Sequence, residues 1–164
     1  MIQLIQSDIS TLSVDCIVNA ANEYLARGSG VCGAIHKAAG PELANECQRL
    51  RPCSTGEAII TSGYNLKSKY VIHAVGPVYD INKIETSALL ESAYLQSLKL
   101  ATQNNLKTIA FPCISTGVYG YPKLEAAEIA IRTVKKYILS NELDIIFCCY
   151  ESEDYQIYEK LLNE

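Results

Sequence analysis

The sequence lacks any long hydrophobic segment and any recognisable leader. No apolar run among the 164 residues approaches the roughly 18 that cross a bilayer. The start, MIQLIQSDIS, lacks the basic region and the long apolar region of a signal peptide. Hydrophobic residues make up 49% and charged residues 20% of the chain, which is typical of a soluble globular protein. We therefore expect a cytoplasmic protein with no membrane contact.

Cysteine pairs are also missing. The seven cysteines are odd in number and include no C-x-x-C pair, so neither a disulfide framework nor a zinc site is indicated. We expect the cysteines to be reduced thiols, and we expect no bound metal and no cofactor.

The chain has no dense cluster of lysine and arginine, and its formal net charge is −4. Nucleic-acid-binding proteins show such clusters, so no nucleic-acid partner is expected. A phosphate-bearing ligand stays open, because backbone N–H groups bind phosphates without basic side chains. The P-loop pattern is absent and no G-x-G-x-x-G follows the first strand, which disfavours two common nucleotide sites.

Short β-branched runs alternate with longer helical patterns, which predicts one α/β domain over residues 1–164. The expected strands are Ile2–Gln6, Asp15–Asn19, Glu57–Ser62, Lys69–Ala74, Lys107–Pro112 and Leu143–Cys149. The expected helices are Val31–Ala39, Pro41–Leu50, Thr86–Asn104, Pro122–Ser140 and Ser152–Asn163. Several strands are apolar almost throughout, as in a mostly parallel sheet covered by helices on both faces. A ligand site is then expected at the carboxyl ends of the strands.

Two glycine-containing loops follow such strand ends and lead into helices. The first carries Arg27-Gly28-Ser29-Gly30-Val31-Cys32-Gly33 and the second Cys113-Ile114-Ser115-Thr116-Gly117-Val118-Tyr119-Gly120-Tyr121-Pro122. Glycine permits close backbone approach, and a helix N-terminus offers unpaired N–H groups. The pair of loops predicts a diphosphate cradle. The alternative is that each glycine only lets the chain turn.

The order and spacing of several motifs resemble a MacroD-type macrodomain over essentially the whole chain. The matching strings are Ser7-Asp8-Ile9, Ile17 through Asn22, Gly30 through Pro41, Val71 through Pro77, Ile114 through Pro122, and the tail from Phe147 through Leu162. The resemblance is closest to the bacterial O-acetyl-ADP-ribose deacetylases and mono-ADP-ribosyl-protein hydrolases. It implies a three-layer α/β/α fold with a central mixed, mostly parallel sheet.

The resemblance also implies which residues meet the adenine of ADP-ribose. The Asp8 carboxylate would accept a hydrogen bond from the exocyclic amine, and Ile9 would offer its backbone N–H. Tyr150, at the end of the last strand, would stack on the ring. The alternatives are that Asp8 caps its own turn, that Tyr150 serves ordinary packing, and that Tyr155 stacks instead.

At the other end of the ligand, the resemblance places Asn22 against the distal ribose and Tyr119 over it. Backbone N–H groups would wrap the phosphates from both loops; they belong to Ser29, Gly30 and Val31 in the first, and to Ser115, Thr116, Gly117 and Val118 in the second. Asn19 is expected instead to pin the loop backbone. His36 and His73 are expected to pack or to bond to the backbone, although Cys32 and His36 share a helix face, which leaves a thiol–imidazole pair open.

Cys32 departs from the family pattern. The resemblance implies an aspartate ten residues after Asn22, where it would orient the ribose and help to position the attacking water, and a thiol cannot reproduce that hydrogen bonding. Some viral macrodomains that resemble this chain have cysteine there and are regarded as hydrolases. The expected catalytic residues are therefore Asn22, Cys32 and Tyr119.

The expected function is hydrolysis of ADP-ribosyl esters, either on acidic side chains of ADP-ribosylated proteins or in O-acetyl-ADP-ribose. The alternatives are a reader module that binds ADP-ribose without turnover and an unrelated α/β phosphate-binding protein.

Overall fold

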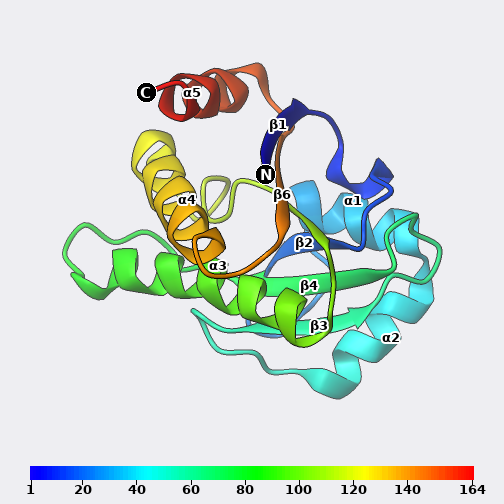
Figure 1. Cartoon of the computed structure of the whole chain (residues 1–164). Helices are drawn as coiled ribbons and strands as arrows, with labels where there is room; N and C mark the ends of the chain where they lie inside the picture. The colour runs from blue at the N-terminus through cyan, green and yellow to red at the C-terminus, as the bar shows by residue number, and fades with distance from the viewer.

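A six-stranded sheet runs through the molecule in the order β1-β6-β5-β2-β4-β3. The computed structural model describes residues 1–164 (Figure 1). The strands are β1 Ile2–Gln6, β2 Cys16–Ala21, β3 Ala58–Ser62, β4 Tyr70–Val75, β5 Thr108–Phe111 and β6 Asp144–Cys149. Only β3 runs antiparallel to its neighbour, and the other neighbouring pairs are parallel. The expected mixed, mostly parallel sheet is confirmed.

Helices cover both faces of this sheet. They are α1 Gly30–Ala39, α2 Pro41–Leu50, α3 Glu85–Gln103, α4 Lys123–Ile138 and α5 Ser152–Leu162. Helices α3, α4 and α5 lie on one face, and α1 and α2 on the other (Figure 1). In β2, Val18 joins the core under α3 and α4 while its neighbour Ile17 joins the core under α1 and α2. The central strands β2, β4 and β5 are mostly apolar because both of their faces are buried.

All six strands and five helices that the sequence predicts are present, and their ends lie within two residues of the predicted ones. Strand β2 runs on to Ala21, beyond the predicted end at Asn19, because Ala20 and Ala21 still pair with β4. A short 3₁₀ helix, Ile9–Thr11, was not predicted. It forms because Asp8 caps its first turn, accepting a hydrogen bond from the Ser10 backbone N–H at 2.9 Å.

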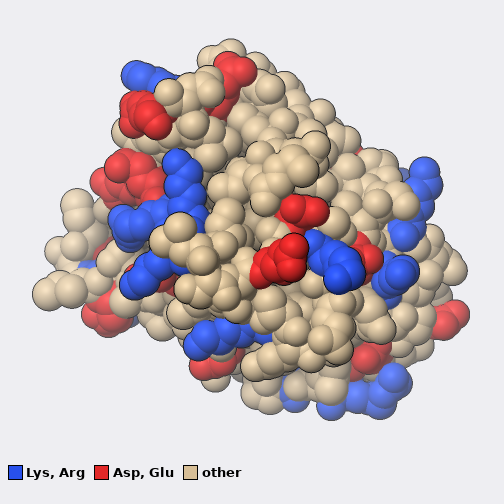
Figure 2. All heavy atoms as spheres, viewed as in Figure 1, with Lys and Arg blue, Asp and Glu red and all other residues tan.

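The charged surface is mixed. On the face drawn in Figure 2, lysine and arginine side chains alternate with aspartate and glutamate side chains, and no continuous basic stripe crosses it. No helix combines the length and the apolar character that a membrane span requires.

Polar side chains occupy the centre of the α1/α2 face of the sheet. The fully buried His73 on β4 receives a hydrogen bond at Nδ1 from Asn19 Nδ2 over 3.1 Å. Its Nε2 therefore carries the proton and donates to Thr61 Oγ1 over 2.9 Å. Burial, and after it the charge of nearby His36, lower the pKa of His73 to about 3. His73 is accordingly a neutral structural group, and it bonds to side chains rather than to the backbone.

We expect the protein to lose stability on acidification because of His73. Below about pH 6.5 the unfolded chain protonates this imidazole while the folded chain does not until about pH 3. The free energy of unfolding should therefore fall by about 1.4 kcal/mol per pH unit across that window from this residue alone. Urea unfolding between pH 7 and pH 4 measures the slope. His73→Gln should give a shallower slope, and an equal slope would contradict the assignment.

Candidate functional site

A cleft of two adjoining lobes lies at the carboxyl ends of β2, β5 and β6. One lobe, called here the Cys32 lobe, has a volume of about 340 Å³. The other, the Asp8 lobe, has a volume of about 410 Å³. Both are lined in part by Gly30, Val31, Cys113 and Gly117, so the lobes meet between the two loops that the sequence singles out.

Every predicted site residue lines one lobe or the other. The Cys32 lobe is lined by Asn22, Ser29, Gly30, Val31, Cys32, Ser115, Gly117, Val118 and Tyr119. The Asp8 lobe is lined by Asp8, Ile9, Gly30, Val31, Thr116, Gly117 and Tyr150. The fold thus gathers segments that are more than 100 residues apart in sequence. Their individual roles toward a ligand stay predictions.

The second loop holds Ser115 in the left-handed backbone region, at φ 71°. Such a conformation is rare for a residue with a side chain and persists only where its surroundings enforce it. The Ser115 carbonyl accepts a hydrogen bond from the Tyr121 N–H at 2.9 Å, while its hydroxyl is buried without a partner. Gly76, after β4, lies against it so closely that a Cβ there would overlap Ser115 Oγ and Ile114 Cγ2. Gly76 is not among the predicted site residues, although a glycine directly after the apolar strand β4 is a usable signal.

The first loop leads into α1 at Gly30, whose φ is 59°. The preceding Ser29 makes no side-chain hydrogen bond to the helix, so N–H groups of the first turn are left for a ligand. A Cβ at Gly33 would come 2.7 Å from the Gly28 carbonyl oxygen. Residues 28–33 have the G-x-G-x-x-G spacing, although they follow the second strand and not the first, and close packing requires the last of these glycines.

Asn22 lines the Cys32 lobe, but its side chain pins the first loop. Its Oδ1 accepts hydrogen bonds from the backbone N–H groups of Tyr24 and Ala26, each at 3.1 Å. Its Nδ2 donates to the Ala26 carbonyl oxygen at 3.1 Å. This is the role expected of Asn19, so that prediction for Asn19 is wrong.

Asn19 is instead buried in the sheet, since β2 continues past it in register with β4. Its Nδ2 donates to His73 and, over 3.5 Å, to the sulfur of Cys32. Its Oδ1 is buried without a hydrogen-bond partner. Asn19 therefore links the buried polar core to the floor of the Cys32 lobe.

The Cys32 thiol is buried and hydrogen-bonded on both sides. It receives the bond from Asn19 and donates to the Ala26 carbonyl oxygen over 3.6 Å. His36 does not pair with it, because both ring nitrogens of His36 lack any partner. Burial, and then the charge of Arg27, lower the pKa of His36. No base stands beside the thiol, and the thiol–imidazole alternative is not what the structure shows.

Tyr119 closes the Cys32 lobe from the second loop. Its backbone carbonyl accepts a hydrogen bond from the Tyr79 N–H at 2.9 Å, which fixes its position. Burial, followed by the charges of Glu23 and Cys32, raises the pKa of the Tyr119 phenol. The side chain is therefore a neutral hydroxyl at neutral pH.

In the Asp8 lobe, Asp8 serves the capping role that the sequence analysis left open. Its Oδ1 also accepts from the Ser10 hydroxyl at 2.7 Å, and these bonds use one of its two carboxylate oxygens. Tyr150 lines the lobe with 72% of its surface exposed. Tyr155 instead packs in α5 against the core. Of the two tyrosines, Tyr150 is the one in the cleft.

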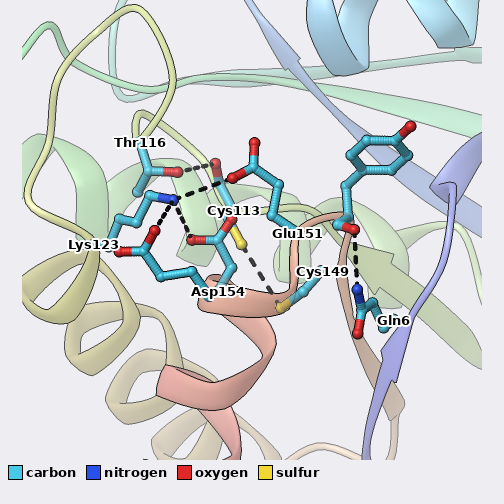
Figure 3. Close-up of polar contacts among 9 residues, drawn as sticks. Gln6, Cys113, Thr116, Lys123, Cys149, Glu151 and Asp154 are labelled. Carbon is cyan, nitrogen blue, oxygen red and sulfur yellow. Dashed lines mark hydrogen bonds and ion pairs between the residues drawn. The ribbon is translucent and has the colours of Figure 1, made fainter.

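A network of charges that was not predicted from the sequence lines part of the Asp8 lobe through Lys123, Glu151 and Asp154. Lys123 Nζ lies 3.1 Å from Asp154 Oδ1, 3.4 Å from Glu153 Oε2 and 3.5 Å from Glu151 Oε2 (Figure 3). Burial lowers the pKa of Lys123, but the carboxylates of Asp154 and Glu153 outweigh that effect and raise it. The network joins the first turns of α4 and α5. No short sequence motif predicts this network, because Lys123 and its carboxylate partners lie about 30 residues apart in the sequence.

The cleft and the fold together define a class of protein. Two backbone loops at the carboxyl edge of an α/β sheet separate two lobes, which suits a ligand with phosphates between two end groups. The chain belongs to the macrodomain family, because residues 18–130 match the family model described as Macro domain. The family expected from the sequence motifs is confirmed.

Curated relatives and solved structures agree. An O-acetyl-ADP-ribose deacetylase of Escherichia fergusonii is 51% identical over an alignment of 169 positions, which covers 99% of this chain and 96% of that protein. The human ADP-ribose glycohydrolase MACROD2 is 50% identical over an alignment of 168 positions, which covers 99% of this chain and 39% of that protein. A mutant of the Oceanobacillus iheyensis macrodomain with ADPR superposes with a TM-score of 0.95 at 41% identity, covering 98% of this chain and 90% of that one.

We expect Gly76→Ala to damage the cleft. The added methyl group must displace Ser115 and Ile114, which costs about 1–3 kcal/mol of stability and turns the second loop away from its position. Thermal unfolding should show a lower midpoint, and calorimetry should show binding of ADP-ribose weakened by at least about tenfold. Val78→Ala, two residues further at an exposed position, is the control and should change neither. Unaltered binding by Gly76→Ala would refute the importance of this contact.

Proposed function

We propose that this chain binds ADP-ribose across both lobes and hydrolyses ADP-ribosyl esters at the distal ribose. Its substrates are mono-ADP-ribose on acidic side chains of ADP-ribosylated proteins, O-acetyl-ADP-ribose, or both. The main support for this proposal is the pair of adjoining lobes, with two loops between them that present backbone N–H groups. We further propose that residues 1–164 form one macrodomain that acts in the cytoplasm without a cofactor.

The Asp8 lobe takes the adenosine end. Asp8 keeps one carboxylate oxygen outside its capping bonds, and this oxygen accepts from the exocyclic amine of adenine. The Ile9 N–H bonds to the ring, and the exposed face of Tyr150 stacks on it. The relative from Oceanobacillus iheyensis, whose structure includes ADPR, supports this choice of ligand.

The diphosphate lies between the lobes. The N–H groups of Ser29, Gly30 and Val31 reach it from the N-terminus of α1. The second loop, bent by the conformation of Ser115, presents the N–H groups of Ser115, Thr116, Gly117 and Val118. No lysine or arginine lines the Cys32 lobe, so backbone dipoles supply the attraction there.

The distal ribose occupies the Cys32 lobe under Tyr119. Water adds to the ester carbonyl carbon, the bond to the ribose oxygen breaks, and the ribose hydroxyl and the carboxylic acid are released. Cys32 is not the nucleophile, because its thiol is buried and donates to Ala26. It orients the ribose together with Asn22, and the ligand's own phosphate assists the water. The deacetylase and glycohydrolase names of the relatives support this reaction class.

A second function, a reader that binds without turnover, is favoured by one observation. No aspartate, glutamate or histidine lines the Cys32 lobe, so no side chain there is suited to act as general base near neutral pH. The two functions share the ligand and differ in whether the ester is cleaved.

The ligand is tested by calorimetry with ADP-ribose. We expect binding by the native chain and at least about tenfold weaker binding by Asp8→Ala, because a hydrogen bond to a charged acceptor contributes about 1.5–3 kcal/mol. No heat of binding in the native chain would refute both functions and favour an unrelated phosphate-binding protein.

Turnover is tested by release of ADP-ribose from glutamate-modified protein. We expect Cys32→Ser to retain activity, because a hydroxyl still donates to Ala26, and Cys32→Asp to retain or raise it, by tenfold or more if the carboxylate activates water. Asn22→Ala should abolish it, and Asn22→Asp, which keeps the Oδ1 acceptor of the loop, separates ribose binding from loop support. Tight binding with no turnover by the native chain would leave the reader function.

A further inference from the structure

One part of the lining of the Asp8 lobe, called here the charged wall, lies outside the proposed adenine, phosphate and distal-ribose contacts. It is formed by Lys123 at the start of α4 and by Glu151 and Asp154 at the start of α5. Figure 3 shows these side chains converging from the two helices, beside Thr116 of the second loop. The Lys123 and Asp154 side chains are 29% and 12% exposed, so the pair is largely fixed.

This wall faces the ribose of adenosine if ADP-ribose binds as proposed above. The adenine is held at Asp8 and the diphosphate at Thr116 and Gly117, so the ribose between them lies in the same lobe. The remaining charged groups that line this lobe are Lys123, Glu151 and Asp154. The 2′ and 3′ hydroxyls of that ribose therefore meet the network.

The positive charge of Lys123 is already neutralised by neighbouring carboxylates. The single ammonium of Lys123 has three carboxylate neighbours, each within 3.5 Å. The N-terminus of α5, which otherwise attracts anions, has Glu151 at its cap position and Glu153 and Asp154 in its first turn. Neither cationic feature is free for a further anion.

We propose that this charged wall selects ADP-ribose whose adenosine ribose carries free hydroxyls and rejects ADP-ribose with a phosphate on that ribose. The inference rests on the proposed function and adds its substrate class: ADP-ribose groups derived from the unphosphorylated dinucleotide. A ribose hydroxyl donates a hydrogen bond to a carboxylate such as Glu151. A phosphate monoester has a charge near −2 at neutral pH, and the lining groups Asp8, Glu151 and Asp154 outweigh Lys123, so the phosphate is repelled.

The experiment compares ADP-ribose with ADP-ribose 2′-phosphate by calorimetry in the full chain. We expect the 2′-phosphate to bind at least about tenfold more weakly at low salt. The ratio of its dissociation constant to that of ADP-ribose should shrink as salt is added. Glu151→Gln removes one negative charge and should lower that ratio by about threefold. Lys123→Gln removes the one cation and should raise it. Glu142→Gln, an exposed position before β6 and thus at the opposite end of the sheet, is the charge-matched control and should leave it unchanged.

Opposite shifts in the two variants identify a charge effect, since a purely steric wall would not respond in opposite directions. Equal affinity for the two ligands, or a ratio that neither variant nor salt alters, would overturn the inference. Failure of ADP-ribose itself to bind the native chain would instead overturn the proposed function. A thermal unfolding curve for each variant establishes that the ratio is measured on folded protein.

Discussion

The cleft depends on the contact between Gly76 and Ser115. The left-handed backbone at Ser115 bends the second loop, and the absence of a side chain at Gly76 leaves room for that bend. Because β2 lies between β4 and β5 in the sheet, the same contact also places the second loop beside the first. A diphosphate can then be bound by backbone N–H groups from both sides, without a lysine or arginine side chain in the Cys32 lobe.

Much of this arrangement follows from the sequence. The strands were predictable because both faces of the sheet are buried, and the two loops because their glycines follow strand ends and precede helices. The residues that line the cleft were predictable through family motifs, since Asp8 and Asn22 stand in strings of fixed spacing. A family motif predicts that a residue lies in the cleft, but it does not predict the hydrogen-bond partners of that residue.

The wrong prediction for Asn19 and the unpredicted Lys123 network have a common physical cause. Asn19 and Asn22 are three residues apart in one motif, and only the end of β2 decides which is buried. Since β2 pairs with β4 through Ala21, Asn19 is in the sheet and Asn22 is in the loop. The Lys123 network was invisible for a similar reason, because it depends on how the starts of α4 and α5 are packed together.

Cysteine in place of the family's aspartate at position 32 changes the hydrogen bonds that stabilise the first loop at the Cys32 lobe. The Ala26 carbonyl oxygen accepts hydrogen bonds from both Asn22 Nδ2 and the Cys32 thiol. An ionised carboxylate at position 32 has no proton to donate and would face that oxygen with its own lone pairs. The thiol therefore closes the first loop where an aspartate would leave a group free for water. Because no acid or imidazole lines this lobe, the hydrolysis proposed above depends on the ligand's diphosphate to assist the water. The backbone cradle that binds the ligand would then also position the group that assists its hydrolysis.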